Sequence, residues 1–103
     1  MSTPSAHFDK RLEELIDRLR AHLAADGELK SSVSAEMAAY EKEVYDAFGL
    51  DANGFYFCEQ AFLDIVRFLV KNDRREIASS FVEEFRNRGY VNPSAANQII
   101  ASK

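Results

Sequence analysis

FYFCEQAFLDIVRFLVK, residues 55–71, is apolar over most of its length. Plotted as a helix at about 100° per residue, its apolar side chains cover roughly 240° of the circumference. The remaining polar strip consists of Gln60, Asp64, Arg67 and Lys71. A helix that is apolar over most of its surface is normally surrounded by other helices, so we expect this segment to be the centre of the domain.

An amphipathic helix is expected before this segment, over about residues 5–25. Its apolar side chains recur at steps of four and three residues, which is the spacing of one helical face. They are Phe8, Leu12, Leu15 and Leu19, with Ile16 and Leu23 widening the stripe. Gly27 is expected to stop this helix, because glycine readily adopts the left-handed conformation that often follows a helix.

A second amphipathic helix is expected next, with a cap at Ser31, Ser32 or Ser34 and a stop at Gly49. Its apolar side chains repeat the same spacing: Val33, Met37, Tyr40, Val44 and Ala47. Both stripes last about two heptads, short of the three or four that indicate a coiled coil. We therefore expect the two helices to form an antiparallel pair within the chain.

Two shorter helices are expected after the central segment. Asn72 can adopt the left-handed stop, and Asp73 can cap a fourth helix over about residues 74–88, which ends before Gly89. The dipeptide Asn92-Pro93 then predicts a short fifth helix, because proline is favoured at the first helical position.

Composition agrees with one all-α domain. The chain has 103 residues, of which 47% are hydrophobic and only four are Gly and two Pro, which argues against disorder and turn-rich β structure. A chain of this length buries about 60–70% of its unfolded surface without needing disulfides or metal. We predict a compact bundle of four helices plus a short C-terminal helix, in a single domain over residues 1–103 with residues 1–5 frayed.

Charge and cysteine content exclude several classes of protein. The net charge of −4 discourages non-specific binding to nucleic acid, because phosphates would be repelled. The lone Cys58 cannot form an internal disulfide or a cysteine-rich zinc site. No segment has the form of a secretory signal or the ~20 apolar residues of a membrane span. We therefore expect a cytoplasmic protein that does not contact a membrane.

The run from Gly49 to Gln60 resembles part of an EF-hand calcium loop. Asp51, Asn53 and Gly54 match its third, fifth and sixth positions. Gly49 and Gln60 then stand at the first and twelfth positions, where the principal anionic ligands belong. We expect no calcium site; instead, Asn53-Gly54 should form a turn, and Asp51 or Asn53 should cap the central helix.

No catalytic constellation is found in the sequence. Glycine patterns of nucleophile elbows, P-loops and dinucleotide-binding folds are absent. Cys58 falls in the middle of an apolar helical face, where thiols are usually inert. His7 and His22 would lie about four helical turns apart, too far to bind one ion. We expect no enzymatic activity, no cofactor and no metal.

The C-terminal region, about residues 76–102, resembles a degenerate helix-turn-helix. A helix, a glycine turn and a polar helix follow one another, and Asn97 and Gln98 are side chains that can bind adenine. However, Phe85 stands where close helix crossing prefers a small residue, and the second helix has no Arg or Lys before Lys103. Nucleic-acid binding is therefore the alternative hypothesis.

Two surface features favour a protein partner. In the second helix, Ala35, Ala38, Ala39 and Tyr45 form a flat face that another helix could approach. In the fourth helix, Arg75, Ser79 and Arg86 lie within about 40° of one another and could hold a carboxylate or phosphate. Structural explanations also exist, because alanine is the best helix former, Tyr45 can pack on a neighbouring element, and charged side chains are usually solvated.

We therefore predict a non-enzymatic protein-protein interaction module, such as a small regulator, inhibitor or immunity-type protein. The predicted docking residues are Ala35, Ala38, Glu41, Lys42, Tyr45, Asp46, Arg75 and Arg86. A homodimer is one form of this prediction. A third possibility is mimicry of a phosphate backbone by Glu41, Glu43 and Asp46, since residues 28–54 carry six acidic and two basic side chains.

Overall fold

The computed structural model describes residues 4–49 and 52–102, without the side chains of residues 4, 5, 52 and 53. Within these ranges the chain forms helices and no strand. The helices are α1 (Pro4–Arg20), α2 (Asp26–Phe48), α3 (Ala52–Lys71), α4 (Arg75–Phe85) and α5 (Pro93–Ala101). The predicted all-α bundle is confirmed. Of the expected frayed start, Pro4 and Ser5 belong to α1, and residues 1–3 lie outside the described ranges.

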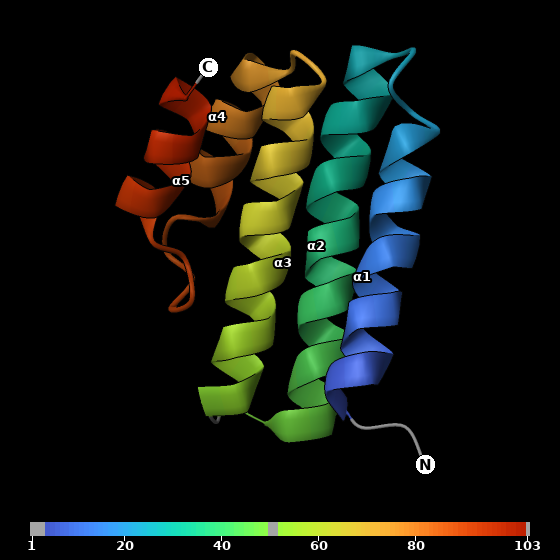
Figure 1. The fold of residues 1–103 in the computed structure, drawn as a ribbon, viewed down its shortest axis with the longest axis vertical. Coiled ribbons are helices and arrows are strands. Elements are labelled where there is room, and N and C mark those ends of the chain that lie inside the picture. The colour runs from blue at the N-terminus through green and yellow to red at the C-terminus, as the bar shows by residue number, and fades with distance from the viewer. Residues whose placement is uncertain (1–3, 50–51, 103) are drawn as a thin grey trace.

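The central position predicted for residues 55–71 is confirmed. α3 packs against each of the other four helices. α1 and α2 lie antiparallel on one side of it, and α4 and α5 lie on the other (Figure 1). Its buried side chains occupy most of its circumference: Cys58, Ala61, Phe62, Ile65, Val66, Phe68 and Leu69.

The boundary between α1 and α2 differs from the prediction. α1 ends at Arg20, and α2 already begins at Asp26, so Gly27 lies in the first turn of α2 and does not stop α1. Leu29 is fully buried, and its burial extends α2 toward its N-terminus. Asp26 and Glu28 suit this first turn because carboxylates are stabilised near the positive end of a helix. The three serines expected as caps lie inside the helix: Ser31, Ser32 and Ser34.

The start of α3 also differs from the prediction. Asn53 and Gly54, expected to form a turn, lie within α3. A Cβ atom added to Gly54 would lie 3.1 Å from the carbonyl oxygen of Gly49, so the glycine permits close approach of α3 to the end of α2. Asp51, the other expected cap, lies outside the described residues. Because α3 begins at Ala52, the segment matched to an EF-hand loop is largely helical.

The reversal between α3 and α4 is shifted by one residue. Asp73, with a φ of 61°, takes the left-handed conformation that was expected of Asn72. The N-cap of α4 is Arg74, which makes no side-chain cap hydrogen bond, so the predicted cap at Asp73 is wrong. Asn72 instead donates its side-chain amide to the carbonyl oxygen of Phe68 at 2.8 Å, near the end of α3.

α4 ends at Phe85, three residues earlier than expected, and residues 86–92 connect it to α5. Gly89 lies in this connector under the ring of Phe55. A Cβ atom added there would lie 2.7 Å from Cε1 of Phe55, so a larger residue at this position would displace the Phe55 ring. The predicted start of α5 is confirmed, because the Asn92 side chain accepts a hydrogen bond from the Ala95 backbone N–H, and Pro93 occupies the first helical position.

Candidate docking surface

Ion pairs and hydrogen bonds between side chains, here called polar latches, join α1 to α2 along their outer surface. Arg11 Nε donates to Glu43 Oε2 at 2.8 Å. Arg18 makes a bidentate pair with Glu36, with Nε–Oε2 and Nη2–Oε1 distances of 2.5 and 3.0 Å. The hydrogen bond from Arg18 lowers the pKa of Glu36 below its ordinary value. Pairs of charged side chains therefore bridge the contact between α1 and α2.

A second latch joins α2 to the elements that follow α3. The Tyr90 hydroxyl donates to Glu41 Oε2 at 2.6 Å, and Arg88 Nε lies 3.2 Å from the same oxygen. Burial, together with this hydrogen bond, raises the pKa of Tyr90 above its ordinary value. Nearby, the Ser34 hydroxyl donates to Glu84 Oε1 at 2.6 Å, linking α2 to α4.

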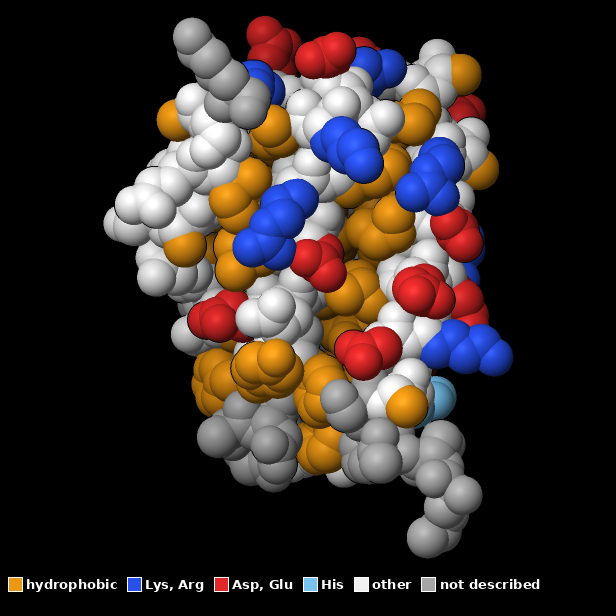
Figure 2. Space-filling model, in the orientation of Figure 1, with side chains coloured by type: hydrophobic (Ala, Val, Ile, Leu, Met, Phe, Trp, Pro, Cys, Tyr) orange, Lys and Arg blue, Asp and Glu red, His pale blue; other side chains and the backbone are white. Residues whose placement is uncertain are grey.

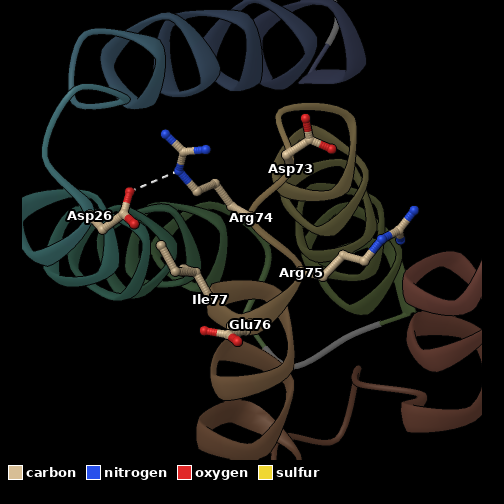
Figure 3. Close-up of a pocket in the computed structure, with 6 residues that line it drawn as sticks. All are labelled: Asp26, Asp73, Arg74, Arg75, Glu76 and Ile77. Carbon is tan, nitrogen blue, oxygen red and sulfur yellow. Dashed lines mark hydrogen bonds and ion pairs between the residues drawn. The ribbon is translucent and has the colours of Figure 1, made fainter.

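Arg74 lines a hollow of about 250 Å³ between two interhelical turns (Figure 3). Its Nε donates to Asp26 Oδ1 at 2.8 Å, and its two terminal nitrogens donate to the carbonyl oxygens of Asn72 and Leu23, each at 2.9 Å. All three guanidinium nitrogens are therefore used within the chain. Arg74 therefore holds the two turns together, and its guanidinium is already engaged within the chain.

Arg75 lies beside Arg74 and points toward α5 (Figure 3). Its guanidinium donates to the backbone carbonyl oxygens of Ile100 and Ser102, at 2.7 Å to Ser102. Carbonyl groups at a helix C-terminus have no partner within the helix and favour a nearby cation. Arg75 therefore caps α5 and joins it to the start of α4.

The contact between the described parts of α1 and α3 lacks the ion pairs that join α1 to α2. Among the described residues, no side-chain hydrogen bond or ion pair joins these two helices. Asp17 pairs with Arg20 at 2.5 Å and Asp64 pairs with Arg67 at 2.8 Å, each within its own helix. Contact across the seam is made by rings: Phe8 and Phe57 have centroids 5.3 Å apart, and Arg20 lies over Phe68.

An open groove of about 550 Å³ lies along this seam and is called the α1–α3 groove below. Its lining consists of Asp9, Leu12, Glu13, Ile16, Asp17, Arg20 and Asp64. The first six belong to α1 and recur at steps of one, three and four residues, so they share one side of that helix. Figure 2 shows hydrophobic side chains along the molecule between the two helices, with acidic side chains on both sides.

Apolar side chains continue from the groove to the start of α3. Leu12 and Ile16 are half-buried and pack on the core, as does Phe57. Beyond Phe57 lies Tyr56, the most exposed large hydrophobic side chain in the described ranges at 58%. The Tyr56 and Phe57 rings meet edge to face, with centroids 5.7 Å apart. Leu12, Ile16, Phe57 and Tyr56 are thus partly or largely accessible to solvent, and they are called the apolar row.

The rim of the groove is acidic. Its lining carries four carboxylates, those of Asp9, Glu13, Asp17 and Asp64, against the single guanidinium of Arg20. Asp17 and Asp64 already have arginine partners within their helices. Within the part of the chain that is described, Asp9 and Glu13 form no ion pair. Two exposed anions therefore face the groove with their charge uncompensated at short range.

The docking residues predicted from the sequence do not form one surface. Ala35, Ala38, Lys42 and Asp46 are exposed on the outer side of α2, where Lys42 and Asp46 pair at 2.9 Å. Glu41 is only 17% exposed and holds Tyr90 and Arg88, whereas Tyr45 is half-buried and packs on the core. Burial raises the pKa of Tyr45 above its ordinary value.

The basic flank predicted on α4 is engaged within the chain. Arg75 binds the end of α5, and Arg86 pairs with Glu83 at 3.2 Å. The outer surface of α2 and this flank are thus separate features. Both leave small side chains exposed, Ala35 and Ala38 on α2 and Ser79 on α4.

Neither an exposed reactive thiol nor a metal-binding cluster is found among the described side chains. Cys58 is fully buried, and burial raises the pKa of its thiol to about 12, so it remains protonated at neutral pH. No group of three or more His, Cys, Asp or Glu side chains in the described ranges could hold a metal ion. In the same ranges, no helix has both the length and the apolar character needed to cross a membrane.

Sequence reasoning did not find the α1–α3 groove, although its signals are present. The acidic residues Asp9, Glu13 and Asp17 recur every four residues beside the apolar stripe of α1. Asp64 belongs to the polar strip of the central helix. What could not be read from the sequence is that these two polar edges meet on the same side of the bundle.

Comparison with protein-family models, with curated proteins and with solved structures finds no match to this chain.

Proposed function

We propose that this protein is a non-enzymatic protein-protein interaction module that binds its partner in the α1–α3 groove. The observation that carries the proposal is the open groove of about 550 Å³ in which Leu12 and Ile16 are half-buried beside a mostly acidic rim, and which no side-chain hydrogen bond or ion pair of the described residues crosses. Such a module acts as a small regulator or inhibitor, because it covers part of its partner's surface and thereby alters the partner's activity.

Burial of the apolar row supplies the driving force. Covering apolar surface stabilises a complex by about 25 cal/mol for each Å² removed from water, before the costs of association. Tyr56 adds an exposed aromatic side chain at one end of the row, and tyrosine is among the residues that most often dominate binding energy.

The outer surface of α2 is the second docking surface to be tested. Ala35, Ala38 and Ala39 are exposed there and would let another helix approach closely, as would be needed for a homodimer. This surface lacks exposed aromatic or large aliphatic side chains, so it offers less apolar area than the α1–α3 groove. It provides the matched control for experiments on the groove.

The nucleic-acid hypotheses have less support. The seven residues between α4 and α5 exceed the three or four of a helix-turn-helix turn, and Arg75 and Arg86 already have partners. For mimicry, the three acidic residues named in α2 are each paired with a cation or hydrogen-bond donor of the chain: Glu41, Glu43 and Asp46.

Affinity capture from lysate of the source cells, with and without nuclease, tests the proposal. The chain would be compared with a groove variant, Leu12→Gln/Ile16→Gln, and with a control on the outer surface of α2, Ala38→Gln/Ala39→Gln. We expect a nuclease-resistant protein to be retained by the wild type and the control and lost by the groove variant. Tyr56→Ser is a second variant at an exposed position, where folding is not at risk.

Circular dichroism and thermal melting would first establish that each variant is folded. Retention of the same partner by all variants, or retention only in the presence of nucleic acid, would contradict the proposed function. Loss with the α2 control alone would move the docking surface to α2.

A further inference from the structure

We infer that the α1–α3 groove takes a basic amphipathic helix of another protein, with an apolar stripe against Leu12 and Ile16 and Lys or Arg side chains beside Asp9 and Glu13. This inference rests on the proposed function and specifies the chemistry of the partner. It follows from the shape of the groove, the topology of the bundle and the imbalance of charge on the rim.

The shape of the groove fits a helix. Its walls are two helices, and its lining on α1 runs from Asp9 to Arg20, about 16 Å along the axis. A partner helix of about three turns covers this length. Leu12 and Ile16 are four residues apart on α1, so they form the kind of ridge that packs into the groove of a neighbouring helix.

The bundle already contains a helix in a comparable position. α4 packs against both α2 and α3, so it occupies the groove between those two helices. α1 packs against α2 and α3 in the same way, but no described helix of this chain covers the groove between α1 and α3 (Figure 1). A docked helix would complete the layer that α1 and α3 leave open.

The charges of the rim select a basic partner. Asp9 and Glu13 have no ion pair among the described residues, and Asp17 and Asp64 add further negative charge to the lining. Complementary charge on a partner steers association and fixes its register. Lys or Arg residues flanking the apolar stripe of a helix would place cations next to Asp9 and Glu13, while the apolar row is covered.

The same charges exclude two other occupants. In a symmetric dimer the same patch meets itself, so a lining with four carboxylates and one guanidinium would meet a second lining of the same negative charge. Like charges brought together in this way cost several kcal/mol. Nucleic acid would be repelled for the same reason, because its phosphates would approach uncompensated carboxylates.

Titration with designed peptides tests the inference. The probe is a peptide of leucine and lysine, about 18 residues long, whose leucines recur at steps of three and four to form one helical face. Two comparison peptides have the same composition with the leucine face disrupted, or glutamate in place of lysine. Binding would be followed by fluorescence anisotropy at about 0.05 and 0.3 M salt.

The chain would carry one of two pairs of charge reversals, Asp9→Lys/Glu13→Lys in the groove or Glu76→Lys/Glu83→Lys on α4. Both pairs change the net charge equally and affect exposed side chains. We expect the groove reversal to weaken binding of the leucine-lysine peptide about tenfold or more, and the α4 reversal to change it by less than about threefold. Disrupting the leucine face should also weaken binding about tenfold.

Equal weakening by both reversals would show non-specific charge attraction and overturn the inference. Equal binding of the glutamate peptide, or no measurable binding of any peptide, would overturn it as well. Capture of the partner by the groove variants distinguishes failure of this inference from failure of the proposed function. If Leu12→Gln/Ile16→Gln loses the partner while Asp9→Lys/Glu13→Lys keeps it, the groove still docks a protein, and only the basic character of that protein is wrong.

Discussion

The hydroxyl of Tyr90 donates a 2.6 Å hydrogen bond to the carboxylate of Glu41 and thereby fastens the connector between α4 and α5 to the middle of α2. Tyr90 is almost fully buried, and Glu41 is 17% exposed, so the bond is largely shielded from water. Arg88 contacts the same carboxylate from the connector. Residues 49 positions apart in sequence thus hold the C-terminal part of the chain on the bundle.

Tyr90→Phe should remove this bond and keep the packing of the ring. We expect a loss of about 1 kcal/mol in the free energy of unfolding, because Glu41 keeps Arg88 as a partner and is not left unpaired. Chemical denaturation of the wild type, Tyr90→Phe, Glu41→Gln and the double variant would measure the coupling. Additive effects of the two substitutions would show that the hydrogen bond contributes nothing to stability.

The bidentate pair of Arg18 and Glu36 predicts a dependence of stability on pH. Glu36 has a lowered pKa in the folded state, so its stabilising contribution is complete above the ordinary glutamate pKa of about 4.3. That contribution is lost as the pH falls through the lowered pKa of the folded state. Arg18 is about half exposed, so solvent screens the pair. We therefore expect the pair to contribute about 0.5–1 kcal/mol to the free energy of unfolding.

Glu36→Gln should therefore lower the free energy of unfolding at pH 7 and lower it progressively less below about pH 4.3. Urea denaturation of both proteins from pH 3 to pH 7 would measure the difference, pH 7 being the reference at which the pair is fully ionised. Asp17→Asn, which affects an exposed pair within α1, is the matched control. A difference that stays constant across this range would mean that the pair does not titrate as described.

The outer surface of α2 gives a prediction that separates docking from folding. Tyr45 is half-buried and packs on the core, so Tyr45→Arg should destabilise the fold by about 1–3 kcal/mol. Ala38 is exposed, so Ala38→Arg should leave the melting temperature nearly unchanged. If α2 contributes to docking, Ala38→Arg weakens partner binding by itself. Equal melting temperatures for Tyr45→Arg and the wild type would contradict the packing of Tyr45.

Features determined by local chemistry were predictable from the sequence, whereas features determined by distant contacts were not. The apolar circumference of residues 55–71 predicted the central helix, and Asn92-Pro93 predicted the start of α5. The start of α2 was placed too late because glycine and serine are local signals for helix ends, whereas the burial of Leu29 depends on the rest of the bundle. Asn72 and Asp73 are both suited to the left-handed conformation, so sequence alone could not separate them.

For the candidate surface, too, local features could be predicted from the sequence and distant contacts could not. Exposed side chains of α2 were identified correctly at Ala35, Ala38, Lys42 and Asp46, because helical spacing separates the inner face of a helix from its outer face. Glu41 is engaged by Tyr90, a residue far away in the chain. Spacing within one helix contains no information about such a partner, and the α1–α3 groove escaped prediction for the same reason.

Arg74 provides the last prediction, because it joins the turn between α1 and α2 to the turn between α3 and α4. Arg74→Ala removes its bonds to Asp26, Asn72 and Leu23 and leaves two backbone carbonyl groups without this donor. We expect a loss of about 2–3 kcal/mol in the free energy of unfolding, since hydrogen bonds from charged groups are stronger than neutral ones. Arg74→Lys should restore only part of it, because an ammonium group cannot reproduce the planar fork of three bonds.

Chemical denaturation would measure both variants, with Arg86→Ala as the control for loss of an exposed arginine that forms an ion pair within its own region of the chain. Hydrogen exchange adds a spatial test. Amide protection should fall first around residues 21–26 and 72–75, the two turns that Arg74 connects. If Arg74→Ala behaved like Arg86→Ala in both measurements, the three hydrogen bonds would not hold the turns together in solution.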